Sequence, residues 1–404
     1  MLELVDRIAA LTPAKQSRSS SRIGVGSHGF DRFEEGVVDM KPAPPGVAVA
    51  HTFDVMDQRG RASILRPQLD PAKRLRAGSS WAMRNAISGA AWLRARVMPA
   101  LVRSPQREVR SRTFDSARWN AYQPRADDII IATYPKCGTT WMQRIVGMLV
   151  FQSAEPMAVQ EISPWLDMRI LGPVERIAAL AEAQTHRRFL KAHLPYDALP
   201  VYEGVKFIHV ARDGRDAAMS YHNHQSAYSA DMIKRITDIS LADPKFGTPY
   251  KPPPADAAEY FHQWVSDQEV LMGDPYATFF HVENSFWAVK DEFHVLLVHF
   301  NDLEADRDGE MRRVAEFLGI ETPAPLWPAL VEAAGFAAMK KVGKQLLPGA
   351  EQGFEGGAER FLFKGKNGRW RDAAHAEDLA MYEARVKAEF PPDLAHWIEH
   401  GRLG

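Results

Sequence analysis

The sequence predicts an α/β fold of three layers, with a mostly parallel central sheet flanked by helices. Four short apolar runs have the composition of buried strands: 128–133 (DIIIAT), 188–193 (RFLKAH), 205–211 (VKFIHVA) and 295–300 (VLLVHF). The segments after the first and third runs have helical patterns, and so do residues 259–272 and 309–319. Strands that alternate with helices form parallel sheets, and such sheets bind ligands at the carboxyl ends of their strands.

The chain is predicted to divide into an irregular or helical N-terminal extension, residues 1–112, and a folded domain, residues 113–404. A chain of 404 residues with 46% apolar side chains is long enough to bury a large core. Residues 14–50, in contrast, contain SRSSSRIGVGSHG and KPAPPG and have little periodicity. We therefore expect no packed structure there and a partly disordered extension.

The second half of the extension is strongly basic. Between Arg59 and Arg112, 13 Lys or Arg stand against two acidic residues. Residues 80–102 have apolar side chains near helical spacing with arginines between them, which predicts a basic amphipathic helix. This helix either docks on the main domain or lies on an anionic membrane, so peripheral membrane contact through residues 80–112 is one expectation.

Composition limits the classes of partner and compartment. The formal net charge of -1 gives no indication of nucleic-acid binding. One cysteine, Cys137, rules out a disulfide framework within the chain and fits a reducing compartment. Glu3 and Asp6 stand where a secretory signal would be positively charged, and no uncharged apolar run reaches the roughly 18 residues of a spanning helix. We expect a cytoplasmic protein, and the sequence does not indicate its oligomeric state.

A compact loop, residues 134–141 (YPKCGTTW), joins the first predicted strand to the next helix. The first amides of a helix have no partners inside the helix and carry partial positive charge, so this loop is suited to an anion. Gly138 permits close backbone approach, while Lys136 adds a full charge. Thr139 and Thr140 add hydroxyl donors, and an ordinary junction in which a threonine caps the helix remains the alternative. The nucleoside triphosphate loop is a different pattern, because its lysine follows its second glycine.

Four segments, in order, resemble signature stretches of the cytosolic-type sulfotransferases, which use 3'-phosphoadenosine 5'-phosphosulfate (PAPS). TYPKCGTTW resembles the family's TYPKSGTTW loop. The other three are KAHLP (191–195), similar to KTHLP; VARDGRDAAMSYHNH (210–224), which resembles the segment that binds the 3'-phosphate; and FKGKNGRWRD (363–372), similar to the terminal RKGxxGDW. The resemblance covers about residues 113–400. It implies a P-loop-like fold and transfer of a sulfuryl group from PAPS to a hydroxyl or amine of a small acceptor, without a metal.

PAPS carries a 5'-phosphosulfate and a separate 3'-phosphate, so two anion sites are required. The residues implied are Lys136, Gly138, Thr139 and Thr140 for the first, with Trp141 stacked on the adenine, and Arg212, Ser220, Lys364 and Gly365 for the second. A guanidinium fork suits bidentate binding of a phosphate. An ion pair of Arg212 with Asp213 or Asp216 is the alternative for that arginine.

Three side chains are candidates for the transfer step, in which catalysis is mostly positioning and charge neutralisation. Lys136 would meet the bridging oxygen of the leaving group. His193 fits a general base for the acceptor's proton, because imidazole titrates near neutral pH. Lys191, on the same face of the predicted strand, would contact the sulfuryl oxygens. His222 and His224 are expected to be surface or pocket-wall residues.

The chain departs from the family pattern near the nucleotide. Phe363 stands where the terminal signature has arginine, and Arg369 where it has aspartate. Ala334 stands where a threonine often helps to bind the nucleotide. Loss of an arginine near a phosphate would weaken donor affinity, unless Arg371 or Lys366 compensates.

Other questions stay open at the level of sequence. Cys137 replaces the loop's usual serine, and its thiol is either activated by the helix start and Lys136 or buried and inert. The acceptor pocket is expected from loops 151–187 and 221–258, whose apolar and aromatic residues indicate a hydrophobic hydroxyl compound. Two other functions remain: an atypical P-loop phosphoryl transferase, which would need magnesium, and a non-catalytic binder of PAPS or its product, 3'-phosphoadenosine 5'-phosphate (PAP).

Overall fold

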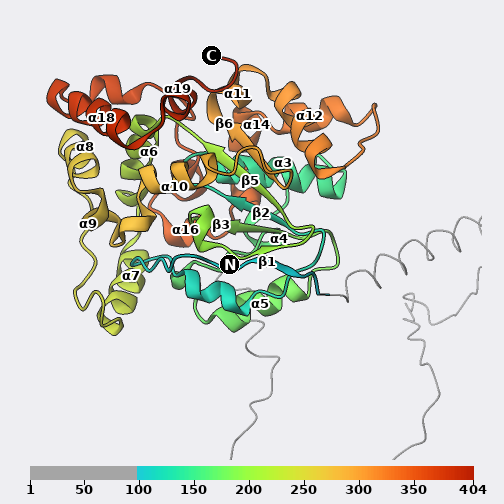
Figure 1. Ribbon diagram of the computed structural model, residues 1–404, viewed down its shortest axis with the longest axis horizontal. Helices are drawn as coiled ribbons and strands as arrows, with labels where there is room; N and C mark the ends of the chain where they lie inside the picture. The colour runs from blue at the N-terminus through green and yellow to red at the C-terminus, as the bar shows by residue number, and fades with distance from the viewer. Residues whose placement is uncertain (1–97) are drawn as a thin grey trace, which may run out of the picture. The chain divides into compact units, whose positions relative to one another are not determined.

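The computed structural model describes residues 98–404 (Figure 1). Residues 14–50, and residues 80–97 of the predicted basic helix, lie outside the described residues. Within residues 98–404, no helix is both long enough and apolar enough to span a membrane.

In the described part of the chain, four strands form one parallel sheet (Figure 1). They are β2 (Ile129–Ala132), β3 (Phe189–Ala192), β5 (Lys206–Ala211) and β6 (Val295–His299), in the order β3-β2-β5-β6. In this register, Ile130 of β2 lies beside Leu190 on one side and Phe207 on the other. Each strand falls within the apolar run that predicted it, so the predicted parallel sheet is confirmed.

Alternate residues of β2 face two different cores. Ile130 and Ala132 pack in one hydrophobic cluster, whereas Ile129 and Ile131 pack in the other. A strand that is buried on both faces reads as a continuous apolar run, which is what the sequence shows here. Helices must therefore cover both faces of the sheet, as the three-layer prediction requires.

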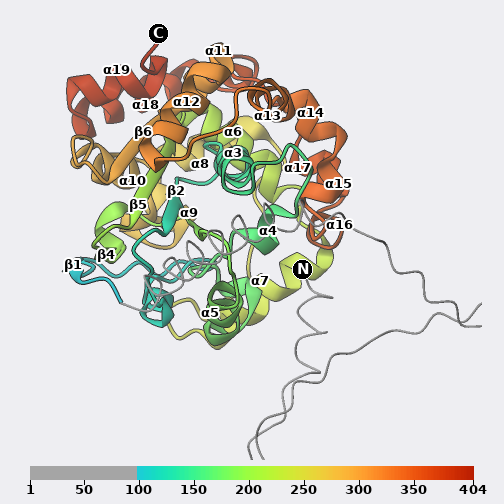
Figure 2. The same cartoon turned by 90° about the vertical axis from the view of Figure 1, so that its right-hand side faces the viewer.

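Two sets of helices supply these layers. The first core includes α5 (Val174–Glu182), α6 (Gly214–Gln225), α8 (Ala257–Ser266), α9 (Gln268–Met272), α10 (Phe279–Trp287), α18 (Ala376–Glu389) and α19 (Pro392–His400). The second includes α3 (Thr139–Phe151), α4 (Val159–Ile162), α11 (Phe300–Ala305), α12 (Arg307–Leu318), α13 (Trp327–Ala333), α14 (Phe336–Lys341), α15 (Gly343–Leu346), α16 (Ala350–Gly353) and α17 (Gly357–Phe361). Figure 2 shows α13 to α17 along one flank, and α7 (Ala230–Ala242) lies outside both cores.

Residues 98–112 pack with the domain. Leu101–Arg103 form β1, which pairs antiparallel with β4 (Val201–Tyr202), and Val109 is fully buried. The predicted helix is therefore wrong at its C-terminal end, because pairing with β4 satisfies these backbone groups as a strand. The segment that packs with the domain therefore begins before residue 113, where the sequence places the domain boundary.

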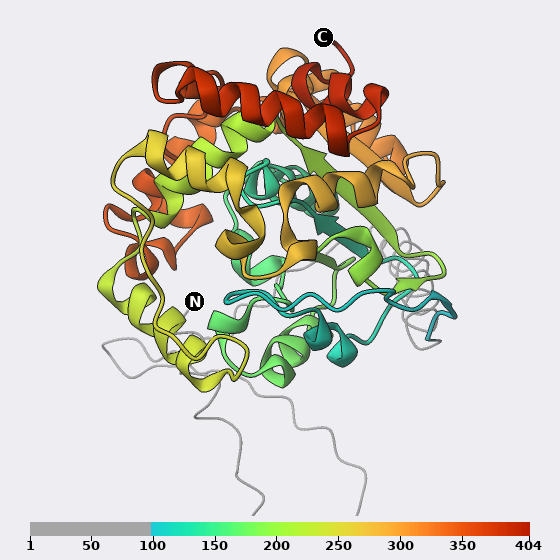
Figure 3. The ribbon, with the colours of Figure 1, turned by 60° about the vertical axis from the view of Figure 1, so that its left-hand side comes forward.

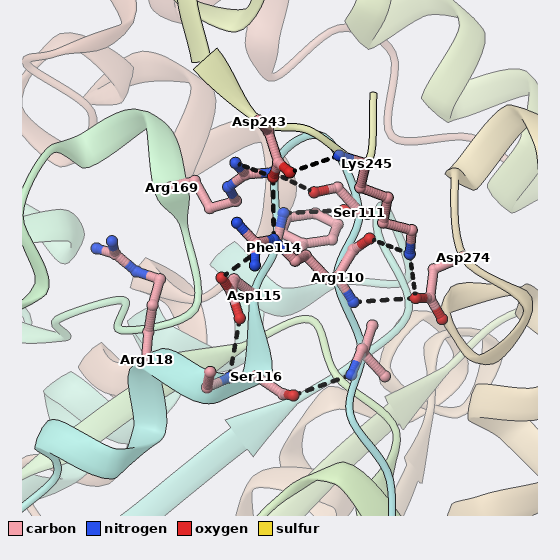
Figure 4. Close-up of polar contacts among 12 residues, drawn as sticks. Arg110, Ser111, Phe114, Asp115, Ser116, Arg118, Arg169, Asp243, Lys245 and Asp274 are labelled. Atoms are coloured by element: carbon pink, nitrogen blue, oxygen red, sulfur yellow. Dashed lines mark hydrogen bonds and ion pairs between the residues drawn. The ribbon is translucent and has the colours of Figure 1, made fainter. Parts of the chain in front are cut away.

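Residues 107–116, here named the strap, cross one face of the domain and are held there by ion pairs (Figures 3 and 4). The carboxylate of Asp243, just after α7, accepts hydrogen bonds from Arg110 Nε at 2.9 Å and from Arg169 Nη2 at 2.6 Å. Arg169 Nη1 also donates to the backbone carbonyl of Ser111 at 2.7 Å. The strap is thus fixed to segments that lie far from it in the sequence.

Candidate active site

A cavity of about 250 Å³ opens at the carboxyl edge of the sheet. Every strand of the sheet has a cavity residue shortly after its end: Lys136 after β2, His193 after β3, Arg212 after β5 and Phe300 after β6. All 11 residues that the sequence predicts for donor binding and catalysis line this cavity: Lys136, Gly138, Thr139, Thr140, Trp141, Lys191, His193, Arg212, Ser220, Lys364 and Gly365. The structure therefore brings the predicted site together at the edge where parallel sheets bind ligands.

The loop before α3 has the backbone conformation that an anion site needs. Lys136 (φ 72°) and Gly138 (φ 116°) are left-handed, and a β-carbon on Gly138 would come within 3.3 Å of Val210. Gly138 is the N-cap of α3, and no side chain caps the helix, so the capping-threonine alternative is wrong. The hydroxyl of Thr139 instead shares a hydrogen bond with Thr133 Oγ1 at 2.6 Å. The first-turn amides thus have no side-chain partner.

Two lysines reach the cavity from neighbouring strands. Lys136 Nζ lies 3.5 Å from His224 Nδ1, and Lys191 Nζ lies 3.5 Å from the centroid of the Trp165 ring. Among residues 98–404, neither lysine has a carboxylate oxygen within 4.0 Å. Burial lowers the pKa of each lysine to about 7, and repulsion from Arg212 adds to the shift at Lys136. An anionic ligand would offset this electrostatic penalty.

His193 is buried and has a defined tautomer. Its Nδ1 lies 2.8 Å from the backbone carbonyl oxygen of Thr133, which requires a proton on Nδ1. Nε2 is therefore the unprotonated nitrogen and can accept a proton. Burial, with repulsion from Lys191, lowers the pKa of His193 well below its usual value. The imidazole is consequently neutral at neutral pH, as a general base must be before it acts.

Asp167 holds this side of the cavity in place, although the sequence does not single it out. Its fully buried carboxylate accepts the backbone N–H of His193 at 3.0 Å and the indole N–H groups of Trp165 and Trp119 at 2.8 and 3.2 Å. Burial raises the pKa of Asp167, and this effect outweighs the lowering of the pKa by the three hydrogen-bond donors. The residue fixes both the end of β3 and the Trp165 ring. Its one signal in the sequence is an aspartate within an apolar loop, PWLDM.

Arg212 occupies the second predicted anion site. Only 4% of it is exposed, and its Nε donates to Asn367 Oδ1 at 2.8 Å. The alternative ion pair is not formed, since Asp213 pairs with Arg215 at 2.6 Å and Asp216 accepts a backbone N–H at 2.8 Å. Asn367 is a further residue that sequence reasoning misses, because its partner lies 155 residues away.

Three further residues predicted for donor binding, Trp141, Ser220 and Gly365, also line the cavity. The indole N–H of Trp141 donates to the backbone carbonyl of Ala334 at 2.7 Å, so alanine in place of threonine keeps this contact. Ser220 reaches the cavity from α6. Gly365 has φ 58°, and a β-carbon there would lie 2.6 Å from the ring of Phe336. Only glycine allows the terminal segment to come so close.

Cys137 does not have the lowered pKa that its position at a helix start would give. The residue is fully buried, and burial raises the pKa of its thiol well above the usual value. This effect outweighs the attraction of Lys136 and Arg212 for the thiolate. The structure therefore favours the inert cysteine of the two alternatives.

The charges around the cavity have one sign. Six basic side chains line it and no aspartate or glutamate does; the six are Lys136, Lys191, Arg212, Lys364, Lys366 and Arg369. A cluster of this kind fits a ligand with several anionic groups, such as the phosphosulfate and 3'-phosphate of PAPS. Within the part of the chain that the structure describes, no group of three or more His, Cys, Asp or Glu could hold a metal ion.

The other half of the cavity is apolar and aromatic. It is lined by Phe114, Val159, Trp165, Met168, Ile170, Leu171, Tyr228, Met232 and Phe354. Both loops expected for the acceptor, 151–187 and 221–258, contribute to this list. The strap contributes as well, which the sequence does not indicate. The ring of Phe114 lies 5.4 Å from that of His193, so the apolar half borders the candidate base.

Comparisons of sequence identify the family of the chain. The chain matches the family model described as the sulfotransferase domain over residues 126–390. A glycolipid sulfotransferase of Mycobacterium bovis is 33% identical over 313 residues, which covers 73% of this chain and 94% of the relative. Sulfotransferase 1C2 of Homo sapiens is 25% identical over 267 residues, 62% of this chain and 79% of the relative.

Comparisons of structure show the same fold. Retinol dehydratase in complex with androsterone and the inactive cofactor PAP aligns with a TM-score of 0.55 and 20% identity, over 69% of this chain and 87% of that one. Mouse sulfotransferase SULT7A1 complexed with PAP aligns with a TM-score of 0.51 and 16% identity, over 70% and 90%. The P-loop-like three-layer fold is thereby confirmed. With the matching family model and the 33% identical relative, these findings show that the chain belongs to the PAPS-dependent sulfotransferases.

Proposed function

We propose that this enzyme transfers the sulfuryl group of PAPS to a hydroxyl, or an amine, of a small hydrophobic acceptor. One observation carries the proposal: six basic side chains without a carboxylate and an apolar, aromatic wall meet in one cavity. The cations suit the donor and the apolar wall suits the acceptor. His193 lies at the border, where the two substrates would meet.

The donor would be held at both of its anionic ends. The amides of the first turn of α3, with the Thr139 and Thr140 hydroxyls, would bind the 5'-phosphosulfate. Arg212, with its 4% exposure and its single polar side-chain partner Asn367, would bind the 3'-phosphate. The remaining donor contacts are assigned by the resemblance: Trp141 to the adenine, Gly138 to close backbone approach, and Ser220, Lys364 and Gly365 to the 3'-phosphate.

The transfer step follows from the positions of three side chains. His193 Nε2 takes the proton of the acceptor hydroxyl while that oxygen forms a bond to sulfur. The bond between sulfur and the 5'-phosphate oxygen breaks, and Lys136 neutralises the charge that develops on this oxygen as PAP leaves. Lys191 would contact the sulfuryl oxygens. Lys136 and Lys191 are buried and have no carboxylate partner within 4.0 Å among residues 98–404, so their charged forms would interact with the anionic donor.

The acceptor's chemistry is proposed from the wall and from the relatives. Aromatic and aliphatic side chains supply most of the acceptor side, and they favour a hydrophobic alcohol. The mycobacterial relatives are glycolipid sulfotransferases, and the retinol dehydratase structure holds androsterone. Glycolipids, steroids and phenols therefore make a discriminating panel.

The test is transfer of labelled sulfate from PAPS to this panel, with and without a chelator of divalent metal ions. We expect transfer to at least one acceptor and no loss on chelation. Stabilisation by ATP and magnesium but not by PAP would instead favour a phosphoryl transferase. Binding of PAP without transfer to any acceptor would favour a non-catalytic binder.

A cytoplasmic location and contact with a membrane surface stay predictions. Support for membrane contact comes from the exposed apolar side chains just after residue 97: Met98 (61%), Leu101 (51%) and Val102 (66%). They continue the basic segment for which an anionic membrane surface is one of two sequence-based alternatives, the other being docking on the main domain. Sedimentation with anionic and with neutral vesicles would test this, and equal recovery with both would contradict it.

A further inference from the structure

Two guanidinium groups lie at the phosphate end of the cavity. Arg212 and Arg369 both line it, and Arg369 also lines two adjoining cavities. Burial lowers the pKa of Arg369, and repulsion from the nearby Arg212 is the second largest cause of this shift. Arg369 in turn contributes to the low pKa of Lys136. Such a concentration of positive charge is unfavourable unless an anion joins it.

Arg369 differs from Arg212 in lacking a polar partner. Its Nε is buried and makes no hydrogen bond, whereas Arg212 Nε donates to Asn367. Among residues 98–404, no carboxylate oxygen lies within 4.0 Å of the Arg369 guanidinium. Asp216 attracts both arginines but accepts the backbone N–H of Gly368 at 2.8 Å. A buried donor without an acceptor costs free energy, and an anionic ligand in the cavity would supply this acceptor.

Phe363 lies beside the guanidinium of Arg369. Its ring centroid is 5.6 Å from Arg369 Cζ, 4.9 Å from Arg360 Cζ and 5.1 Å from Lys364 Nζ. The terminal signature of the family has arginine at position 363 and aspartate at position 369, so this chain has the positive charge six residues later. The aromatic ring supplies a face on which the cations rest.

We propose that Arg369 binds the 3'-phosphate of the donor together with Arg212, in place of the arginine that position 363 lacks, an inference that rests on the proposed donor site. The sequence offers two other candidates for this compensation, Lys366 and Arg371. Lys366 lines the same cavity but is exposed at the surface. Arg371 lines none of the three cavities and rests on the ring of Trp370 at 4.3 Å.

The first test compares two ligands by calorimetry. PAP has both phosphates, and adenosine 5'-phosphate lacks the 3'-phosphate. Arg369→Ala should weaken PAP binding by about tenfold or more and leave adenosine 5'-phosphate binding within about twofold. Arg371→Ala, a matched control two residues away, should leave both affinities unchanged. Equal losses for the two ligands would place Arg369 at the 5' end and overturn the assignment.

The second test returns the charge to its position in the signature. Arg369→Asp should abolish measurable PAP binding, and Phe363→Arg combined with Arg369→Asp should bring the affinity back to within a few-fold of the parent. Failure of this rescue would overturn the inference, as would unchanged PAP affinity in Arg369→Ala. Arg369→Gln gives a milder variant if the alanine variant does not fold. Failure of the parent itself to bind PAP would contradict the whole donor site, an outcome distinct from an effect of Arg369 alone.

Discussion

Two clusters of basic side chains in this domain have opposite environments. In the first, here named the strap cluster, Arg110 and Arg169 share the carboxylate of Asp243, and Lys245 Nζ lies 2.9 Å from Asp274 Oδ2 (Figure 4). In the second, the donor cavity, six basic side chains line the walls and no carboxylate does. The first cluster is neutralised by the fold itself, and the second is left for a ligand to neutralise.

This difference distinguishes charged side chains that stabilise the fold from charged side chains that are available to bind a ligand. A buried ion pair that loses one partner leaves an uncompensated charge, so changes in the strap cluster should lower stability. An unpaired cation lowers stability while it is present, so its removal from the cavity should affect binding and turnover but not the fold. Substitutions in the strap cluster should therefore change stability but not binding, and substitutions in the cavity should change binding and turnover but not the fold.

The largest effect is expected from His193→Ala. Loss of proton transfer should lower turnover at saturating donor by roughly 10²- to 10⁴-fold, while PAP affinity stays nearly intact because neither anion site changes. His222→Ala is the matched control, since His222 Nε2 lies 2.8 Å from the carbonyl oxygen of Pro254 and the residue does not line the donor cavity. Normal turnover in His193→Ala would show that the base is another group.

The strap cluster should give the next largest effect, on stability instead of turnover. Asp243→Ala leaves the side chain of Arg169, 10% exposed, without its carboxylate and should lower the free energy of unfolding by about 3 kcal/mol in a urea titration. Asp238→Ala, in α7, breaks an exposed pair with Lys234 and should cost less than about 0.5 kcal/mol. PAP affinity should be unchanged in both variants. A large loss of PAP affinity in Asp243→Ala would mean that the two clusters are coupled.

The sequence predicts the donor cavity well because its residues follow the sheet's strands within local motifs. Lys136, His193 and Arg212 each stand a few residues after an apolar run, and parallel strands bring such positions to one edge. The continuous apolar run of β2 likewise indicates a strand that is buried on both faces. For these features, local sequence contains most of the information that the fold uses.

The pairing of charges, in contrast, could not be predicted. Arg110 in REVRSR and Arg369 in NGRWRD look equally solvated in sequence, yet Arg110 meets Asp243 across 133 residues. The same limit hides Asp167, whose partners are brought together by the end of β3. It also hides β1, where pairing with β4 overrides a helical pattern.

A third prediction concerns donor affinity. Arg212→Ala should weaken PAP binding by about ten- to a hundredfold, equivalent to about 1.5 to 3 kcal/mol for a charged hydrogen bond. Its free energy of unfolding should fall by less than that of Asp243→Ala, because the variant loses hydrogen bonds to Asn367 but no carboxylate partner. Calorimetry and urea unfolding of the same sample measure both quantities. Tight PAP binding in this variant would place the 3'-phosphate elsewhere.

The smallest effect, and the most specific, is in pH dependence. The pKa values of Lys136 and Lys191 are about 7 in the fold, against 10.5 for an unperturbed lysine. Between pH 7 and 10.5 the unfolded chain therefore binds more protons, so these lysines destabilise the ligand-free protein fully below about pH 7 and progressively less as pH rises. Asp243 has the opposite behaviour: its pKa is lowered from 3.8, so its stabilising contribution is present above that value and is lost as pH falls.

The same shifts link PAP binding to protons. An anion beside Lys136 and Lys191 favours their charged forms, so at pH 8, where both are mostly neutral, PAP should bind with an uptake of roughly one proton or more. Calorimetry in two buffers of different ionisation enthalpy measures this uptake directly. Lys136→Met should reduce it, whereas Lys245→Met in the strap cluster should leave it unchanged, because Lys245 is already paired with Asp274. Equal heats in the two buffers would show that the cavity lysines are charged before the donor arrives, and the contrast between the two clusters would then rest on their carboxylates alone.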